Sequence, residues 1–431
     1  MIVQRELLNQ IKIFIKRKEF IAITGPRQCG KSTFLEIIRD YLIKEIKIDR
    51  ESINILTFED RKLLAQFESD PVEFVNSYLS QNTGKTTYLM LDGFQYAEEG
   101  GQKLKLIYDT VKNVKIIITG SSSLEIKGYM VGRILTFNLY PFSFKEYLNA
   151  KDKRFEKIYV EKNKMVLNWL FKRKKPVQKI GQDLFADDFN KLFEKYCIWG
   201  GYPAVVLSKT TIERKKVLND IYNNYLLKDI KGLLELTTER NLVLLAQFIA
   251  AQISNILVYQ NMSQASGLEF RQLKKHLNIL QETFICKEVS PYFKNKQKEL
   301  VKNPKAYFLD LGFRNNLLDS MNNNFIQRTD TGAIVENVIF IRLSELSQGR
   351  ERINFWRTKT GSEIDFIFKI NGYVVPIEVK YSNFDRPQVT RSFIGFIDTF
   401  HPRQGVILTK NYWGLIKRNN TEILFAPVYY L

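Results

Sequence analysis

The sequence predicts an α/β protein with a parallel sheet in its amino-terminal part and a second α/β region in its carboxy-terminal part. Between residues 20 and 120, short apolar runs alternate with segments of helical spacing, as in units that build a parallel sheet. Residues 237 to 290 read as three helices and a strand, which predicts a helical middle part. From residue 332 to residue 380, a helical segment precedes three strand-like runs, which predicts the second α/β region.

Length and charge limit the class of protein. A chain of 431 residues is too long for one hydrophobic core, so about three domains are expected. Its 45% hydrophobic and 26% charged residues are typical of a soluble globular protein. The 65 basic and 46 acidic residues give a net charge of +19, which is spread over the whole chain. This predicts a polyanionic partner, with DNA preferred and an anionic membrane surface as the alternative.

Cysteine usage and hydropathy exclude further classes. Cys29, Cys197 and Cys286 lie far apart and form no C-x-x-C pair, and only two histidines accompany them. We therefore expect no zinc site and a reduced, cytoplasmic location. The first 20 residues carry charges within their apolar pattern and no small-residue cleavage site, unlike a signal peptide. Polar residues interrupt the long uncharged stretch from Asn241 to Leu268, so we expect no membrane insertion.

A phosphate-binding motif, G-x-x-x-x-G-K-[ST], follows the apolar run Phe20–Thr24 and precedes a segment of helical spacing. This context favours a P-loop over a plain glycine-rich turn. In a P-loop, backbone N–H groups and the positive end of the helix bind nucleotide phosphates. We expect Lys31 to reach the β- and γ-phosphates of ATP and Ser32 to bind Mg²⁺. The predicted nucleotide-binding residues are Gly25, Pro26, Arg27, Gln28, Cys29, Gly30, Lys31, Ser32 and Thr33.

A second ATPase signature ends at Asp92, the last residue of another apolar run. We expect Asp92 to bind Mg²⁺ through water. Such enzymes usually place a glutamate next, to polarise the attacking water, but here the next residue is Gly93. Either hydrolysis is slow, or another carboxylate supplies the base. Glu59 is the preferred candidate, with Glu98 and Glu99 nearby, and a structural role for Glu59 at a helix start is the alternative.

Two further positions are candidates for contact with the γ-phosphate. Ser121 or Ser122, after the apolar run Val114–Thr119, is a candidate sensor of that phosphate. Arg133 is a candidate cation, either within its own chain or across the subunit boundary of a homo-oligomer. An ordinary surface role for Arg133 is the alternative.

The middle of the chain is basic and contains a candidate DNA reader. Its densest run, Lys172–Lys175, is typical of a solvated face or connector, with phosphate contact as the alternative. The three helices and following strand predict a winged helix, whose third helix would turn Arg271, Lys274 and Lys275 outward to contact DNA. A module used only for packing or dimerisation is the alternative.

The carboxy-terminal part carries a nuclease-like pattern. Asp365 on one predicted strand precedes Glu378-x-Lys380 on the next, the spacing of PD-(D/E)xK nucleases. Alternation places Glu378 and Lys380 on one face, and a hairpin sets Asp365 beside Glu378, so that two carboxylates share a divalent ion. Glu336, on a helix that we expect to be strongly amphipathic, completes the metal shell, while Lys380 positions or deprotonates a water. The alternative is a salt bridge in an inactive fold used for binding.

Several ordered segments together resemble a known family. They read GPRQCGKST, LTFED, LMLDGFQ, ITGSSS, GRILTFNLYPFSFKEYL and YCIWGGYPAVV. Over nearly the whole chain they resemble prokaryotic AAA+-type ATPases with a carboxy-terminal restriction-endonuclease-like domain. In that family the second signature reads aspartate, glutamate, apolar residue, glutamine; Asp92, Phe94 and Gln95 fit, and Gly93 departs. The resemblance implies that Gly200-Gly201 joins the nucleotide core to the helical part.

These observations predict four segments. They are a P-loop AAA+-like core at 1–150, a helical lid or connector at 151–235, a winged-helix-like domain at 236–310 and a PD-(D/E)xK nuclease-like domain at 311–431. We predict an ATP-binding protein that acts on DNA, in which the ATP–Mg²⁺ state controls the metal-dependent nuclease-like domain. The alternative is an ATP-gated DNA- or protein-binding switch with weak or no hydrolysis and an inactive nuclease fold. Residues alone leave open whether the chain is an ATPase impaired at Gly93 and a Mg²⁺-dependent endonuclease.

Overall fold

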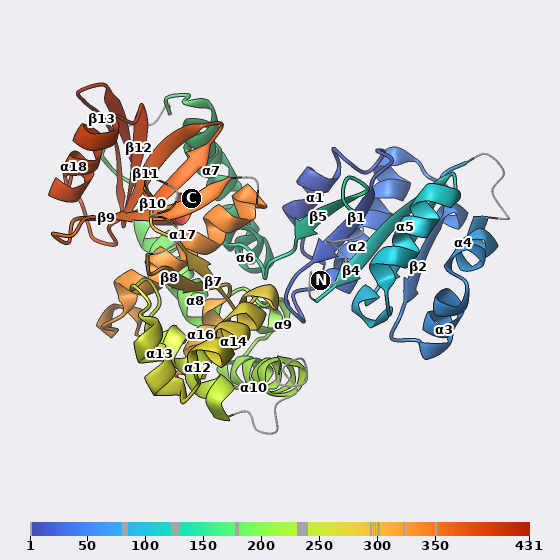
Figure 1. Cartoon of the computed structure of the whole chain (residues 1–431). Coiled ribbons are helices and arrows are strands. Elements are labelled where there is room, and N and C mark those ends of the chain that lie inside the picture. The colour runs from blue at the N-terminus through green and yellow to red at the C-terminus, as the bar shows by residue number, and fades with distance from the viewer. Residues whose placement is uncertain are drawn as a thin grey trace. The chain divides into compact units, whose positions relative to one another are not determined.

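The computed structural model describes residues 2–79, 85–121, 130–176, 181–230, 240–293, 295, 297, 299, 302–321, 324–349 and 351–431. Contacts within the chain divide it into two compact units. The first comprises Met1–Pro141 and Glu282–Phe284, and the second comprises Phe142–Gln281 and Ile285–Leu431. Figure 1 labels many of the helices and strands of both units.

A five-stranded, wholly parallel sheet forms the centre of the first unit, in the order β2-β3-β4-β1-β5. The strands are β1 (Phe20–Thr24), β2 (Ile53–Thr57), β3 (Thr87–Asp92), β4 (Val114–Gly120) and β5 (Ile134–Asn138). The helices are α1 (Leu7–Ile11), α2 (Lys31–Tyr41), α3 (Arg61–Ser69), α4 (Pro71–Leu79) and α5 (Gly100–Thr110), with the short turns η1 (Leu42–Ile46), η2 (Arg50–Ser52) and η3 (Phe94–Tyr96). The predicted α/β class with a parallel sheet is confirmed for this unit.

Strand β1 shows how alternation builds a core on each face of this sheet. Ile21 and Ile23 point to the face where α1 and α2 pack. Phe20 and Ala22 point to the other face, where they meet side chains of α3, α4 and α5. All four are buried, because successive side chains of a strand leave opposite faces and helices cover both. The apolar run without polar alternation is the expected sequence of such a strand.

The second unit contains a mixed seven-stranded sheet, in the order β6-β13-β14-β12-β11-β10-β9, and a separate pair of strands, β7 and β8. The strands are β6 (Gly181–Gln182), β7 (Cys286–Val289), β8 (Lys305–Phe308), β9 (Arg352–Arg357), β10 (Glu363–Ile370), β11 (Tyr373–Val379), β12 (Gln404–Thr409), β13 (Tyr412–Arg418) and β14 (Thr421–Pro427). The helices are α6 (Phe144–Lys151), α7 (Lys153–Lys172), α8 (Ala186–Trp199), α9 (Pro203–Leu207), α10 (Thr211–Tyr222), α12 (Arg240–Ala251), α13 (Tyr259–Ser266), α14 (Phe270–Glu282), α16 (Leu311–Leu317), α17 (Thr331–Ser347) and α18 (Arg391–Phe400), with η4 (Asn223–Ile230), η5 (Phe325–Gln327) and η6 (Val428–Tyr430).

Helices cover both faces of the seven-stranded sheet (Figure 1). Helix α18 packs on one face, where Phe393 joins a cluster with Ile364 and Ile407. Helix α7 packs on the other face, where the ring of Phe171 meets the edge of Phe368. Helix α17 contacts β9 and β11 and also α8, α16 and β8. We expected α17 to be strongly amphipathic, and this is wrong: it is buried on most sides because sheet and helices surround it.

The middle segment contains three helices followed by an antiparallel strand pair. They are α12, α13, α14, β7 and β8. On α14, Leu273, Leu277 and Leu280 are buried, whereas Arg271 and Lys275 are exposed. The polarity of α14 therefore follows the helical spacing of its leucines.

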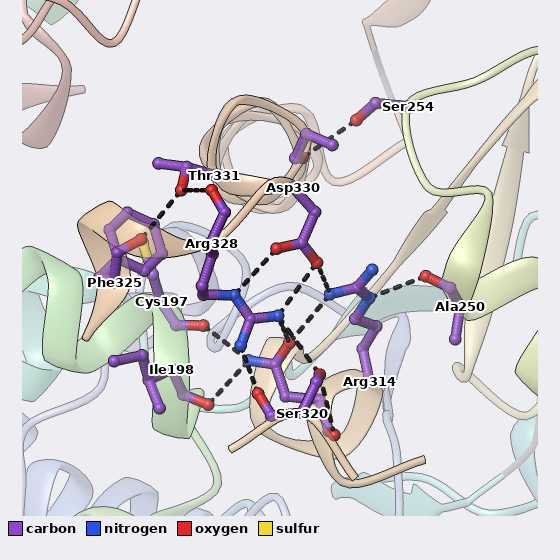
Figure 2. A network of polar contacts seen from close by, with 12 residues as sticks. Cys197, Ile198, Ala250, Ser254, Arg314, Ser320, Phe325, Arg328, Asp330 and Thr331 are labelled. Atoms are coloured by element: carbon purple, nitrogen blue, oxygen red, sulfur yellow. Dashed lines mark hydrogen bonds and ion pairs between the residues drawn. The ribbon is translucent and has the colours of Figure 1, made fainter. Parts of the chain in front are cut away.

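A network of buried charges ties four helices of the second unit together (Figure 2). Asp330, directly before α17, pairs with Nη1 of Arg314 at 2.5 Å and with Nε of Arg328 at 2.9 Å. Arg314 lies on α16 and also donates to the carbonyl oxygen of Ala250, at the end of α12 (2.8 Å). The next residue, Asn315, donates to the carbonyl oxygens of Cys197 and Ile198, near the end of α8. Asp330, Arg314 and Asn315 together thus connect α8, α12, α16 and the start of α17.

The Gly200-Gly201 pair fits against the start of the second unit. A side chain on Gly201 would come within 2.2 Å of the carbonyl oxygen of Phe142, and one on Gly200 within 2.4 Å of the Asp310 carboxylate. Phe142 donates its N–H to the Gly201 carbonyl at 2.7 Å, and Gly201 donates its own N–H to Asp310 at 2.7 Å. Burial raises the pKa of Asp310 to about 6. Only glycine allows these close approaches.

The charge network yields a prediction for stability. Arg314→Leu leaves the partly buried Asp330 with one guanidinium partner and the Ala250 carbonyl without its donor. We expect the free energy of unfolding to fall by about 3–5 kcal/mol, the usual cost of breaking a buried pair. Urea unfolding measures this change. Arg386→Leu, at an exposed position, is the control and should change it by less than about 0.5 kcal/mol; an equally small effect of Arg314→Leu would contradict the assigned role.

Candidate functional site

The P-loop connects the carboxyl end of β1 to the amino end of α2, as predicted. Gly30 is the N-cap of α2 and has a φ of 93°, which favours glycine. A Cβ on Gly25 would lie 2.1 Å from the carbonyl oxygen of Leu139, so the loop passes that backbone too closely for any other residue. The two defining glycines of the motif are therefore required by geometry as well as by phosphate binding.

The Lys31 side chain folds back on its own loop. Its ammonium group donates to the carbonyl oxygens of Gly25 at 2.9 Å and Pro26 at 2.8 Å. Burial lowers the pKa of Lys31, against the opposing effects of Cys29 and Asp92. To reach a phosphate, this ammonium would exchange two carbonyl oxygens for phosphate oxygens.

Asp92 lies beside the P-loop, as predicted. The Ser32 hydroxyl donates to one Asp92 oxygen at 2.5 Å, and the Thr119 hydroxyl donates to the other. Thr119 also accepts the N–H of Gly93 at 3.3 Å. A hydroxyl and a carboxylate at this place are the donor set that holds Mg²⁺ in P-loop ATPases, so the residues fit ATP with Mg²⁺. Thr119 was not predicted. It is a polar residue near the end of β4, the strand beside β3, and this position could have suggested a role next to Asp92.

Gly93 directly follows β3 and has a left-handed backbone conformation that favours glycine. Its φ is 76°, and a Cβ there would lie 3.4 Å from the ring of Tyr96 and 3.9 Å from the backbone nitrogen of Glu59. Strand β2 neighbours β3, with Thr57 opposite Asp92. Glu59 is exposed, two residues beyond the end of β2. Its backbone therefore lies close to the place of the usual glutamate, and its role as a base stays a prediction.

Arg5 supports the P-loop and was missed by sequence reasoning. Its guanidinium donates to the carbonyl oxygen of Cys29 at 2.9 Å and to that of Tyr140 at 2.5 Å. Next to Tyr140, Leu139 donates its N–H to the carbonyl of Thr24, directly before the loop. The segment after β5 is thus bound to both ends of the loop. No local pattern marks Arg5, because its partners lie 24 and 135 positions away.

The remaining nucleotide-site candidates lie around this loop. The guanidinium of Arg27 is 3.4 Å from the hydroxyl of Tyr96. Gln28 and Thr33 are exposed, and Ser121, directly after β4, is partly buried. Ser122 lies outside the described residues.

Arg133 lies too far from the P-loop to contact the γ-phosphate of ATP bound to the same chain. It precedes β5, and its carbonyl accepts the N–H of Phe20, the first residue of β1. The P-loop follows the last residue of β1, and amino ends of parallel strands share one edge of the sheet. Arg133 therefore lies at the opposite edge, where it pairs with Asp109 at 3.0 Å, and the within-chain role is wrong. A role across a subunit boundary stays a prediction.

The carboxy-terminal candidates lie where two strands and one helix meet. Phe366 pairs with Ile377 between antiparallel β10 and β11, so one further step sets Asp365 opposite Glu378, as predicted. Asp365 accepts the N–H of Val379 at 2.7 Å. Burial, followed by the charge of Glu336, raises the pKa of Asp365 to about 8.

Glu378 has its own partners. Both carboxylate oxygens lie within 3.0 Å of the Thr390 hydroxyl. Lys380, half exposed and directly after β11, pairs with Glu378 at 3.0 Å. Glu378 itself is buried. The ion pair therefore joins two residues on the same face of one strand, and it is not the cross-strand salt bridge of the inactive alternative.

Lys305, a residue that sequence reasoning missed, stands inside the carboxylate cluster. It comes from β8 and is 1% exposed. Its ammonium lies 3.1 Å from Glu336 and 2.5 Å from Glu363, and the Tyr307 hydroxyl donates to Glu336 at 2.6 Å. Burial lowers the pKa of Lys305, but the charges of Glu336, Glu363 and Asp365 outweigh this, and the pKa is raised. We call Lys305, Tyr307, Glu336 and Glu363 the Lys305 cluster.

A divalent ion does not fit the predicted shell of Glu336, Asp365 and Glu378. Within the described ranges, no three His, Cys, Asp or Glu side chains are placed to hold a metal. Glu336 is taken by Lys305 and Tyr307, and Glu378 by Thr390 and Lys380. In this arrangement a lysine supplies the positive charge that a metal would supply.

The basic residues predicted to contact DNA lie along α14. Lys274 stands 3.4 Å above the ring of Tyr259 and 5.8 Å from that of Phe270. Phe270 is 60% exposed, and Arg271 and Lys275 are exposed. The contact of these residues with DNA stays a prediction.

Three protein-family models match the chain. An AAA domain matches residues 17–148, a domain of unknown function (DUF8612) matches 190–324, and a second one (DUF4143) matches 331–428. Residues 17–148 are therefore an AAA-type P-loop domain. The match implies nucleotide binding, and it covers the strands, the P-loop and Asp92. The two other models assign no function to the second unit.

Curated relatives are themselves uncharacterised. A protein of Haemophilus influenzae is 24% identical over 98% of this chain and 97% of its own length. A protein of Mycobacterium tuberculosis and one of Mycobacterium bovis are each 25% identical over 28% of this chain and 26% of theirs. Among solved structures, PCH-2 of C. elegans matches 37% of this chain and 42% of its own at 14% identity and a TM-score of 0.25, too low to carry an argument. Of the helices that the structure describes, none is long and apolar enough to span a membrane.

Gly25→Ala tests the P-loop geometry. The new methyl group would collide with the Leu139 carbonyl, so we expect nucleotide binding to weaken at least tenfold, or about 1.4 kcal/mol. Titration with a fluorescent ATP analogue measures this. Gly395→Ala is the control, since nothing lies within 4 Å of its Cβ position. Unchanged affinity in Gly25→Ala would show that the close approach is not required.

Lys305→Met tests the charge balance of the Lys305 cluster. It removes the ammonium group that the partly buried Glu336 and Glu363 both contact, and among the described ion pairs only Glu363 keeps another cation, Arg357. We expect the free energy of unfolding to fall by about 3–5 kcal/mol near pH 7. Denaturant unfolding provides the measurement, with Lys359→Met at an exposed position as control. If the two variants lost equally little stability, the ammonium would not be the counter-charge of the cluster.

Proposed function

We propose that this protein is an ATP-gated switch that binds DNA and hydrolyses ATP slowly or not at all. The observation that carries the proposal is Gly93, which stands after Asp92 where P-loop ATPases usually have the catalytic glutamate. The loop, Ser32 and Asp92 retain what binding requires. Binding and turnover are thus separable in this site.

ATP would be held by the AAA-type domain. Backbone N–H groups of the P-loop would bind its phosphates, and Lys31 would leave the carbonyls of Gly25 and Pro26 for phosphate oxygens. Ser32 and Asp92 would hold Mg²⁺, which when bound neutralises phosphate charge. Thr119 would orient Asp92 through the hydrogen bond that it donates. Glu59 is the one nearby carboxylate that we retain as a candidate base.

The gate would be the segment that continues from β5 into the second unit. In the first unit, Leu139 and Tyr140 are bound to the backbone of the P-loop and to Arg5. In the second unit, Phe142 is bound to Gly201, whose N–H is held by Asp310. These positions are separated by few peptide bonds, so a shift of the loop would pull on a short, anchored segment. Two-state behaviour of this segment is what would couple ATP to the second unit.

DNA would be contacted by the basic surface of α14. Arg271, Lys274 and Lys275 are the candidates, and the winged-helix arrangement would present them to a groove. The net charge of +19 supports a polyanionic partner. In this function the Lys305 cluster is a structural centre and the nuclease-like fold is a binding module.

A second candidate is an ATP-controlled, metal-dependent nuclease with a restriction-endonuclease-like domain. The placement of Asp365 opposite Glu378, with Lys380 beside it, favours this candidate. It requires Lys305 to leave Glu336 and Glu363. The nuclease would thus be inactive in the arrangement of charges found here.

Measurements of ATP turnover and DNA affinity on the same preparation test the proposal. We expect phosphate release near background with Mg²⁺, with or without DNA, and a DNA affinity that changes about 5–150-fold between ATP and no nucleotide, the usual range of coupling. Lys31→Ala should remove this nucleotide effect. Lys275→Ala should weaken DNA binding in both states and reduce its salt dependence, whereas Lys216→Ala, also exposed, serves as control.

Other outcomes would contradict the switch in specific ways. Rapid turnover abolished by Glu59→Gln would make the protein a working ATPase with a displaced base. Mg²⁺-dependent cleavage of DNA, lost in Asp365→Asn, would establish the second candidate. DNA affinity that is the same with and without ATP would exclude gating.

A further inference from the structure

A second cavity of the first unit lies away from the P-loop. It has a volume of about 770 Å³, and its lining includes Ser52, Thr86 and Asn113, the residues directly before β2, β3 and β4. These residues mark the amino ends of the parallel strands, whereas the P-loop follows a carboxyl end. The cavity is within the usual size of small-molecule sites and is separate from the nucleotide site.

Positive charge dominates the lining of this cavity. Six basic residues line it, against the single carboxylate of Asp49: Lys16, Arg17, Lys18, Lys47, Lys85 and Lys115. Lys85 pairs with Asp49 at 2.8 Å, and Arg17 pairs with Glu19 at 2.5 Å. The remaining four lysines leave a local excess of positive charge that would attract an anion.

The buried Lys115 holds the backbone that forms one part of this cavity in place. It extends from β4, is 3% exposed and donates to the carbonyl oxygens of Phe14 at 3.2 Å and Arg17 at 2.8 Å, and to that of Glu19. These bonds fold the segment that carries Lys16 and Lys18 over the end of the sheet. Burial lowers the pKa of Lys115 to about 8, so a bound anion would stabilise its charged form.

Part of the lining is apolar. Ile46 and Ile48 are partly exposed there, whereas Ile15 and Tyr88 are almost wholly buried. A simple inorganic anion would leave this wall without a partner. A ligand with a polyphosphate and an uncharged ring or hydrocarbon part would satisfy both sides.

We propose that this cavity is a second ligand site, for a small phosphorylated molecule that carries at least three negative charges. Lys16, Lys18 and Lys47 bind its phosphates, and Ile46 and Ile48 contact its uncharged part. Lys115 positions the segment that carries two of these lysines. The site does not depend on the function proposed for the P-loop.

Calorimetric titration separates this site from the P-loop. The probes are inorganic tripolyphosphate and guanosine triphosphate, added to the chain bearing Lys31→Ala at low salt. We expect one equivalent of each to bind, the nucleotide more tightly. Adding Lys16→Glu and Lys47→Glu should weaken both at least about tenfold, since each lysine offers a charge-assisted hydrogen bond. Adding Lys44→Glu instead should change nothing, because Lys44 is exposed nearby but outside the lining.

Acetylation of lysines, read by mass spectrometry, locates the bound probe in the unsubstituted chain. Tripolyphosphate should protect Lys16, Lys18 and Lys47 and leave Lys44 reactive. The proposal is overturned if the Lys31→Ala chain binds neither probe, if charge reversal leaves binding unchanged, or if protection falls elsewhere. Equal affinity for the two probes would contradict the contact between the isoleucines and the uncharged part of the ligand. Loss of all binding with Lys31→Ala alone would show that both probes bind at the P-loop, and it would support the ATP site there.

Discussion

The pairing of the partly buried Asp330 with Arg314 and Arg328 is the interaction on which the helical part of the second unit depends. A carboxylate partly withdrawn from water needs compensating charge, and two guanidinium groups provide it. Arg314 extends the network to the end of α12, and the neighbouring Asn315 extends it to the end of α8. Because Asp330 stands directly before α17, it also sets where that helix begins. Glu336, about one and a half turns further along, takes its place in the Lys305 cluster from this starting point.

The two sites of this chain handle charge in opposite ways. In the P-loop, donors are held ready: backbone N–H groups, the Ser32 hydroxyl and a lysine that occupies carbonyl oxygens of its own loop. In the Lys305 cluster, the ammonium group already sits between Glu336 and Glu363. The first arrangement is completed by a ligand, whereas the second is complete without one. This difference explains why the P-loop fits its expected cofactor and the carboxylate shell does not.

Local patterns in the sequence predicted the strands and the P-loop of the first unit well, but they predicted the buried charged residues of the second unit poorly. Strand β1 was predicted to the residue, because an apolar run before a glycine-rich motif has few other structures available to it. Arg5, Thr119 and Lys305 were missed, since each acts through a partner that only the fold brings near. The within-chain role of Arg133 was misjudged, because a position shortly after β4 in sequence does not show which end of the sheet the residue reaches. The burial of α17 was missed for a related reason: helical spacing reveals one apolar face but not that neighbours cover the others.

Gly93 also bears on how long the ATP-bound state would last. In a nucleotide switch with a catalytic glutamate, hydrolysis of ATP ends the active state, so the hydrolysis rate sets its lifetime. In the switch that we propose, the protein would return to its resting state chiefly when ATP dissociates. Its occupancy would then follow the surrounding ratio of ATP to competing nucleotides, with little or no ATP consumed. The fraction of such a molecule in the ATP-bound state would report the ATP level around it and would change reversibly with that level.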